Sequence, residues 1–193
     1  MNAQDFRASI STTVRVLERL RDEKTADMER VADALSRCVR AGKKILLCGN
    51  GGSAADSQHM ATELIVRYLA DRPAIPAIAL TCDTSTLTAA ANDLGFEQIF
   101  SRQVEALGQE GDALIAISTS GESANVIAAV RTAKAKGLVT IALTGESGGT
   151  LAPLAHHWIG VPSKHTPRVQ EAQLVVEHLL CEAIEAGWTE KKR

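Results

Sequence analysis

Residues 45–54 read ILLCGNGGSA, and this stretch decides the fold class. Four apolar residues lead directly into a turn of glycine, asparagine and serine, and a helical pattern follows over residues 54–66. A strand that is apolar throughout is typical of a parallel sheet covered on both faces. The stretch therefore indicates a strand, a glycine-containing turn and a helix, which is the repeating unit of an α/β fold.

The same alternation continues through the rest of the chain. Apolar runs that predict further strands lie at residues 77–80, 113–117, 139–143 and, more weakly, 158–161. The helical patterns that alternate with them lie at residues 86–91, 125–136, 150–155 and 167–186. We therefore expect an α/β fold with a doubly wound, five-stranded parallel sheet flanked by helices. No linker interrupts the pattern, so residues 1–193 are expected to form one domain.

Helical patterns also precede the first strand. The apolar residues at helical spacing are Ile10, Val14, Leu17 and Leu20, followed by Val31, Leu35, Cys38 and Val39. The polar stretch DEKTAD, residues 22–27, predicts a break between two helices, with Thr25 or Asp27 as the cap of the second. We expect an N-terminal helical hairpin over residues 1–41 that serves in packing or in oligomerisation.

The composition is that of an ordinary globular protein. The 193 residues are 45% apolar and 23% charged, with a formal net charge of -2. This charge balance, together with only 3% aromatic residues, argues against a nucleic-acid partner. No apolar stretch is long enough to span a bilayer and no signal peptide is recognisable, so we expect a cytoplasmic protein without a membrane partner.

The sequence contains four cysteines, none of them in a C-x-x-C pair. They are Cys38, Cys48, Cys82 and Cys181. Each lies in an apolar or mixed segment, which favours buried thiols of a reducing compartment over a disulfide or zinc framework.

Three polar turns follow predicted strands, at residues 49–53, 118–123 and 144–149. Ligands of open α/β sheets bind at the carboxyl ends of the strands. The second turn carries four hydroxyls ahead of a helix, which makes it the candidate phosphate cradle. Ordinary strand-to-helix turns use the same residue types, and that alternative remains open. Residues 49–54 also match a loose dinucleotide fingerprint, but no convincing acidic partner follows.

Two clusters of titratable and amide side chains stand on predicted helices. His59 and Glu63 are four residues apart and share a helix face, where they could bind a metal, act on one substrate or simply pair at the surface. The last helix carries the second cluster, which consists of Gln170, Glu171, Gln173, Glu177 and His178. The apolar neighbours of His178 favour a buried structural role for this histidine. Gln170 and His178 are about 12 Å apart along a helix axis, so they reach one centre only if their side chains lean together or different subunits contribute them.

Four separated segments together resemble one known family. They are LLCGNGGSAADSQHMATEL at 46–64, AANDLGFEQIFSRQVEALGQEGD at 90–112, ISTSGESANVI at 117–127 and TPRVQEAQLVVEH at 166–178. The chain resembles the sugar isomerase (SIS) domain family, in its phosphoheptose isomerase branch. The resemblance implies a homotetramer with active sites between subunits. It also implies isomerisation of sedoheptulose 7-phosphate to D-glycero-D-manno-heptose 7-phosphate, the first step towards the ADP-heptose of lipopolysaccharide.

The resemblance also assigns residues to roles. It implies that Glu63 and His178 are the catalytic pair. The implied ligands of one Zn²⁺ per subunit are His59, Glu63, Gln170 and His178. The implied substrate-binding residues are Asn50, Gly51, Gly52, Glu63, Asn92, Asp93, Ser118, Thr119, Ser120, Ser123 and Gln170. A replication regulator that binds the initiator DnaA has similar glycine and serine loops, so a non-catalytic regulator is the alternative.

Overall fold

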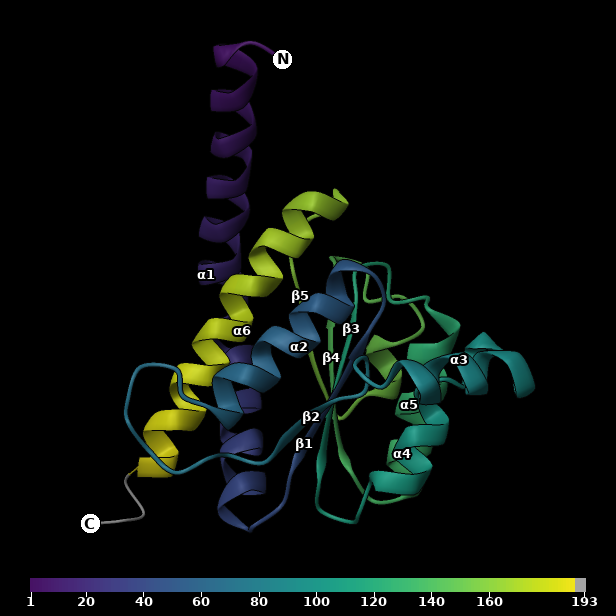
Figure 1. The fold of residues 1–193 in the computed structure, drawn as a ribbon. Coiled ribbons are helices and arrows are strands. Elements are labelled where there is room, and N and C mark those ends of the chain that lie inside the picture. The colour runs from purple at the N-terminus through teal and green to yellow at the C-terminus, as the bar shows by residue number, and fades with distance from the viewer. Residues whose placement is uncertain (190–193) are drawn as a thin grey trace.

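The computed structural model describes residues 1–189 and contains one five-stranded parallel sheet between two layers of helices (Figure 1). The strands are β1 (Ile45–Gly49), β2 (Ala77–Ala79), β3 (Ala113–Ser118), β4 (Val139–Thr144) and β5 (His157–Gly160). Their order across the sheet is β2-β1-β3-β4-β5. The chain therefore builds outward from β1 to one edge and then, from β3, to the other. This confirms the doubly wound α/β fold.

The helices divide between the two faces of the sheet. One face is covered by α1 (Ala3–Arg40), α2 (Gly52–Ile65) and α6 (Thr166–Thr189). The other face carries α3 (Thr84–Asp93), α4 (Ser101–Leu107) and α5 (Ala124–Ala135), with the short 3₁₀ turns η1 (Phe96–Gln98) and η2 (Ala152–Leu154). No helix of the described residues is long and apolar enough to cross a membrane.

Side chains of the central strands alternate between two hydrophobic cores. Ile45 and Leu47 of β1 pack under α1, α2 and α6, whereas Leu46 and Cys48 pack under α4 and α5. All five residues of β1 and all six of β3 are buried. Burial on both faces is the physical reason that these strands read as continuous apolar runs in the sequence.

The expected break in the N-terminal hairpin is wrong, because α1 is a single helix from Ala3 to Arg40. The polar residues 22–27 contain no glycine or proline, and they support the helix. The Thr25 hydroxyl donates to the Arg21 carbonyl oxygen, and Asp27 pairs with Lys24 and Arg30. The first half of α1 projects beyond the sheet (Figure 1). Phe6, Ile10 and Val14 on this half are exposed.

Three smaller expectations also need correction. Residues 150–155 form only the short turn η2, with Pro153 near its start, instead of a helix. The helix α4 was not expected, because it is seven residues long and buries only Gln103 and Val104. Cys82 is exposed, since it follows the edge strand β2, whereas the other three cysteines are buried as expected.

Candidate functional site

The turns after β1 and β3 lie next to each other at the carboxyl edge of the sheet. Gly49 at the end of β1 pairs with Ile117 of β3, and the strand order reverses between these two strands. Asn50 donates to the side-chain oxygen of Asn125 over 2.9 Å and accepts from its amide nitrogen over 2.8 Å. This pair joins the glycine turn to the start of α5 at the place where ligands of doubly wound sheets bind.

The serine-rich turn at residues 118–123 has the chemistry of an anion site. The hydroxyl oxygens of Ser118 and Ser123 lie 3.0 Å apart, and the Gly121 amide donates to the Ser118 hydroxyl over 3.2 Å. Ser123 stands at the N-terminus of α5 but makes no side-chain capping bond to it. Hydroxyls and first-turn amides with a partial positive charge are the groups that hold a phosphate. Thr119 and Ser120 complete this turn, with Ser120 exposed.

The third polar turn supports the second. The Gly145 amide donates to the Thr119 carbonyl oxygen over 3.0 Å. The Glu122 carboxylate accepts from both the amide and the hydroxyl of Thr150, each over 2.8 Å. Residues 144–150 therefore stabilise the serine-rich turn through these hydrogen bonds.

Helices α2 and α6 bring the two predicted titratable clusters together. They lie side by side on one face of the sheet (Figure 1), and the Nε2 atoms of His59 and His178 are 2.7 Å apart. Glu63 lies one helical turn beyond His59, with its Oε1 atom 3.9 Å from the same Nε2 atom. All three side chains are half-buried. The sequence pattern alone left these clusters apart, and the packing of the helices joins a carboxylate to two imidazoles.

Gln170 stands nearer the start of α6 and lies apart from the histidine pair. Its amide lies over Gly52 at the start of α2, where an added Cβ atom would come within 2.8 Å of Nε2. The described residues show no hydrogen bond between Gln170 and the histidine pair. The absence of a side chain at Gly52 makes room for this amide beside the glycine turn.

The donor atoms of the histidine pair and Glu63 are of the kinds that Zn²⁺ prefers. However, two ligands of one tetrahedral zinc lie about 3.3 Å apart when each bond is about 2.05 Å. The 2.7 Å separation of the imidazole nitrogens is instead that of a hydrogen bond. Within residues 1–189, no group of three or more histidine, cysteine, aspartate or glutamate side chains meets the geometry of a metal site.

Asn92 and Asp93 lie away from the histidine pair. They are the exposed last residues of α3, and the Asn92 amide donates to Asp93 over 2.7 Å. Helix α3 stands on the other side of the sheet from α2 and α6 (Figure 1). A single chain therefore does not bring these two residues to the site on α2 and α6.

Three residues near the site had no assigned role from the sequence. Asn125 is buried against Asn50, and the Tyr68 ring lies 5.5 Å from the His178 ring. Glu177 is only 1% exposed, and neither of its carboxylate oxygens has a hydrogen-bond partner among the described residues. Burial raises the pKa of Glu177 to about 8, and the nearby charge of Asp56 adds to the effect. In the sequence, Asn125 stands in the serine-rich segment and Glu177 in the polar cluster of the last helix, whereas Tyr68 carried no signal.

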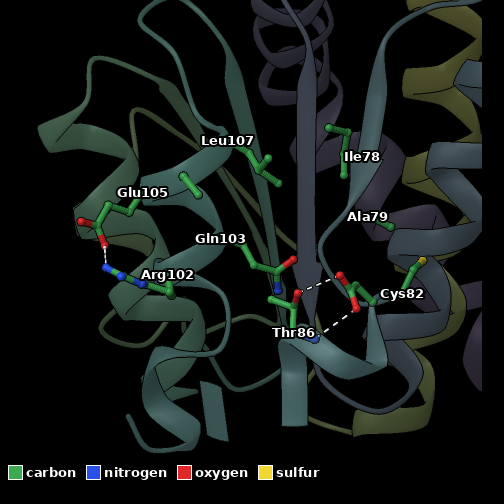
Figure 2. A pocket seen from close by; sticks show the side chains of 10 residues that line it. Ile78, Ala79, Cys82, Thr86, Arg102, Gln103, Glu105 and Leu107 are labelled. Carbon is green, nitrogen blue, oxygen red and sulfur yellow. Dashed lines mark hydrogen bonds and ion pairs between the residues drawn. The ribbon is translucent and has the colours of Figure 1, made fainter. Parts of the chain in front are cut away.

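A separate cavity lies on the other face of the sheet. It measures about 650 Å³ and is lined by residues of β2, α4 and the start of α3, as Figure 2 shows. Asp83 accepts two hydrogen bonds from Thr86 at one side, and Arg102 pairs with Glu105 at the other. None of the predicted site residues lines it. This cavity lies at the open edge of the sheet, beside β2. Neither the histidine pair nor the Asn50–Asn125 pair lines it.

Comparisons with known proteins identify a family and solved structures of the same fold. Residues 10–145 match the family model described as SIS domain. A phosphoheptose isomerase from Desulfovibrio desulfuricans is 52% identical over 160 residues, which cover 83% of this chain and 76% of that protein. The structure of a phosphoheptose isomerase from Neisseria gonorrhoeae is 40% identical, with a TM-score of 0.90 over 95% of this chain and 98% of that one. A phosphoheptose isomerase structure from Francisella tularensis is 36% identical, with a TM-score of 0.92 over 96% of this chain and 100% of that one.

Proposed function

Because the chain belongs to the SIS domain family, in its phosphoheptose isomerase branch, we propose that it isomerises sedoheptulose 7-phosphate to D-glycero-D-manno-heptose 7-phosphate. The observation that carries this proposal is the agreement with a solved phosphoheptose isomerase over 95% of the chain. Neither the comparisons nor the structure supports the alternative of a DnaA-binding regulator. The product would feed the ADP-heptose route to lipopolysaccharide in the cytoplasm.

An aldose–ketose isomerase moves one proton between adjacent carbons and one between adjacent oxygens, through an enediol or enediolate. Glu63 would move the proton between C1 and C2, because a half-buried carboxylate beside the carbon is a suitable base. His178 would exchange protons with O1 and O2. Support comes from the short His59–His178 contact, which holds the imidazole on the same side of α2 as Glu63.

The phosphate would bind at the serine-rich turn, away from the reacting carbons. Ser118, Thr119, Ser120 and Ser123 supply hydroxyls there, and the start of α5 supplies amides. Asn50, Gly51 and Gly52 would contact the sugar between the two ends, with Gln170 beside them. Anchoring the far end of the ketose keeps the reacting carbons in register with Glu63.

We also infer a homotetramer with active sites between subunits, in which Asn92 and Asp93 reach the sugar from a neighbouring copy. The exposed apolar side chains Phe6, Ile10 and Val14 on the projecting half of α1 support association. Leu174 and Leu179 on α6 are also exposed and lie on the same face of the sheet as α1.

The proposed zinc would be held by His59, Glu63 and His178, with Gln170 as the fourth ligand. Bound there, the metal would polarise the carbonyl oxygen and stabilise negative charge on it. The imidazoles would have to separate from their present hydrogen bond, and the Gln170 amide would have to turn away from Gly52.

The replacement Glu63→Gln tests the proposal directly. Aldose formation from sedoheptulose 7-phosphate should fall by about 10²- to 10⁴-fold, the usual contribution of a general acid–base group. Glu105→Gln is the matched control, because this exposed carboxylate pairs with Arg102, away from the site. A near wild-type rate in Glu63→Gln would rule out Glu63 as the base. Wild-type protein that turns over no ketose phosphate but captures DnaA would overturn the whole assignment.

A further inference from the structure

We propose that Arg72 and Glu185 form a buried clasp that positions Glu63 and Tyr68 for the isomerisation; this inference rests on the function proposed above. Glu185 projects from α6, and Arg72 lies in the segment that follows α2. Their side chains are 5% and 1% exposed, and Nε of Arg72 lies 2.9 Å from Oε1 of Glu185. A buried ion pair of this kind adds little net stability compared with apolar packing, so its value is expected to lie in the geometry it imposes.

Glu185 holds the backbone that follows α2. Its Oε1 atom accepts from the Tyr68 amide over 3.0 Å, and its Oε2 atom accepts from the Leu69 and Ala70 amides, each over 2.8 Å. Three successive amides thus point at one carboxylate. The segment between α2 and β2 has no regular structure of its own, and Val66 and Leu69 are 64% and 66% exposed. The carboxylate therefore orders the backbone of this segment, in addition to the packing of the Tyr68 ring against the core.

Arg72 holds the end of α2. Its Nη2 atom donates to the Glu63 carbonyl oxygen and its Nη1 atom to the Leu64 carbonyl oxygen, each over 2.7 Å. These carbonyls belong to the last turn of the helix, which lacks intrahelical partners and attracts a cation. One planar guanidinium thus fixes the backbone of the proposed base and the carboxylate of Glu185 at the same time.

The ordered segment places Tyr68 against the second proposed catalytic residue. The rings of Tyr68 and His178 have centroids 5.5 Å apart and planes inclined by 30°, and the Nε2 atom of His178 lies 2.7 Å from that of His59. Glu185 lies seven residues beyond His178 on α6, about 10 Å along the axis. The clasp therefore touches no reacting atom and acts through Glu63 and through the ring of Tyr68.

The test separates positioning from simple stability. Glu185→Gln and Arg72→Lys should each lower kcat at least tenfold while KM changes less than threefold, because the phosphate turn is remote. Displacing a reacting group by about 1 Å can cost about 10²-fold in rate. Tyr68→Leu should lower kcat similarly, and Tyr68→Phe should restore it, because the ring is the part that contacts His178.

Asp112→Asn is the matched control. Asp112 is also a buried carboxylate, which accepts from the Lys44 and Gln109 amides and pairs with the Lys44 ammonium. It stands before β3, at the amino edge of the sheet, away from the proposed site. The Asp112→Asn variant should lower the melting temperature by about as much as Glu185→Gln does, and it should leave kcat within twofold of wild type.

Equal kcat in Glu185→Gln and Asp112→Asn would overturn the clasp, as would a wild-type kcat in Tyr68→Leu. If Glu185→Gln does not fold, Arg72→Lys and Tyr68→Leu decide the question. Absence of turnover in the wild-type protein would instead overturn the proposed function and the clasp with it.

Discussion

Replacing Gly121 with alanine should destabilise the protein and weaken phosphate binding, whereas the same change at Gly42 should have only a mild effect. Both glycines have left-handed φ angles, +71° for Gly121 and +77° for Gly42. A Cβ atom in that conformation costs about 1–2 kcal/mol at either position. The two sites differ in the room available for an added Cβ atom. At Gly42 nothing lies within 4 Å of it, whereas at Gly121 it would come within 2.2 Å of the Gly148 carbonyl oxygen.

The clash at Gly121 is with backbone atoms, which cannot rotate away as a flexible side chain can. Overpacking of this kind adds about 1–3 kcal/mol. The expected loss of unfolding free energy is therefore about 1–2 kcal/mol for Gly42→Ala and about 2–5 kcal/mol for Gly121→Ala. At about 2–4 °C per kcal/mol for a chain of this size, the melting temperatures should fall by about 2–8 °C and about 4–20 °C respectively.

Substrate binding gives an independent readout. The Gly121 amide donates to the carbonyl oxygen of Ser118 over 3.1 Å and to its hydroxyl over 3.2 Å, so moving Gly121 displaces the hydroxyls of the turn. Loss of one charge-assisted hydrogen bond to the phosphate, about 1.5–3 kcal/mol, should raise KM by about 10- to 150-fold. Thermal melts and steady-state kinetics measure both effects. Equal melting temperatures for the two variants, or an unchanged KM in Gly121→Ala, would contradict the proposed clash with the Gly148 carbonyl oxygen.

Three further predictions use simpler measurements. Protein purified without a chelator should contain about one zinc per chain by elemental analysis, and a metal-free preparation with full activity would contradict the four-ligand site. A thiol reagent should label Cys82 alone in the native protein, because burial raises the pKa values of Cys38, Cys48 and Cys181 to about 11, 12 and 12. Labelling should vanish in the Cys82→Ser variant, and a second thiol that reacts quickly would contradict this prediction. Burial opposes ionisation of Glu185, but the three backbone amides and Arg72 outweigh it and lower its pKa below the usual 4.5. The stabilising effect of the ionised carboxylate should be complete above pH 4.5 and lost as the pH falls through the lower pKa of the folded state. The melting temperature between pH 3 and 6 should therefore depend less on pH in Glu185→Gln than in the wild type. Parallel plots of melting temperature against pH for the two proteins would contradict this.

The fold class could be predicted from the sequence because a strand buried on both faces of the sheet appears as a continuous apolar run. The apolar runs of β1, β3 and β4 and the turns after them were recognisable without knowing what they pack against. Predictions based on local polarity were wrong where other parts of the molecule set the environment of a residue. Residues 22–27 remain helical because they contain no glycine or proline and because Lys24 packs over the Trp158 ring, and Cys82 is exposed because it follows an edge strand. A seven-residue helix such as α4 is too short to show a period.

By itself, the sequence determined which segments would be strands, which helix faces were apolar, and that the serine-rich turn could hold an anion. Side-chain periodicity and turn chemistry are properties of neighbouring residues, so these features need no tertiary information. The contact of His178 with His59, which is 119 positions away, and that of Asn50 with Asn125, 75 positions away, depend on the packing of distant elements. Periodicity shows that a face will be buried, but the order of the strands decides which helices share a face of the sheet and which side chains then meet.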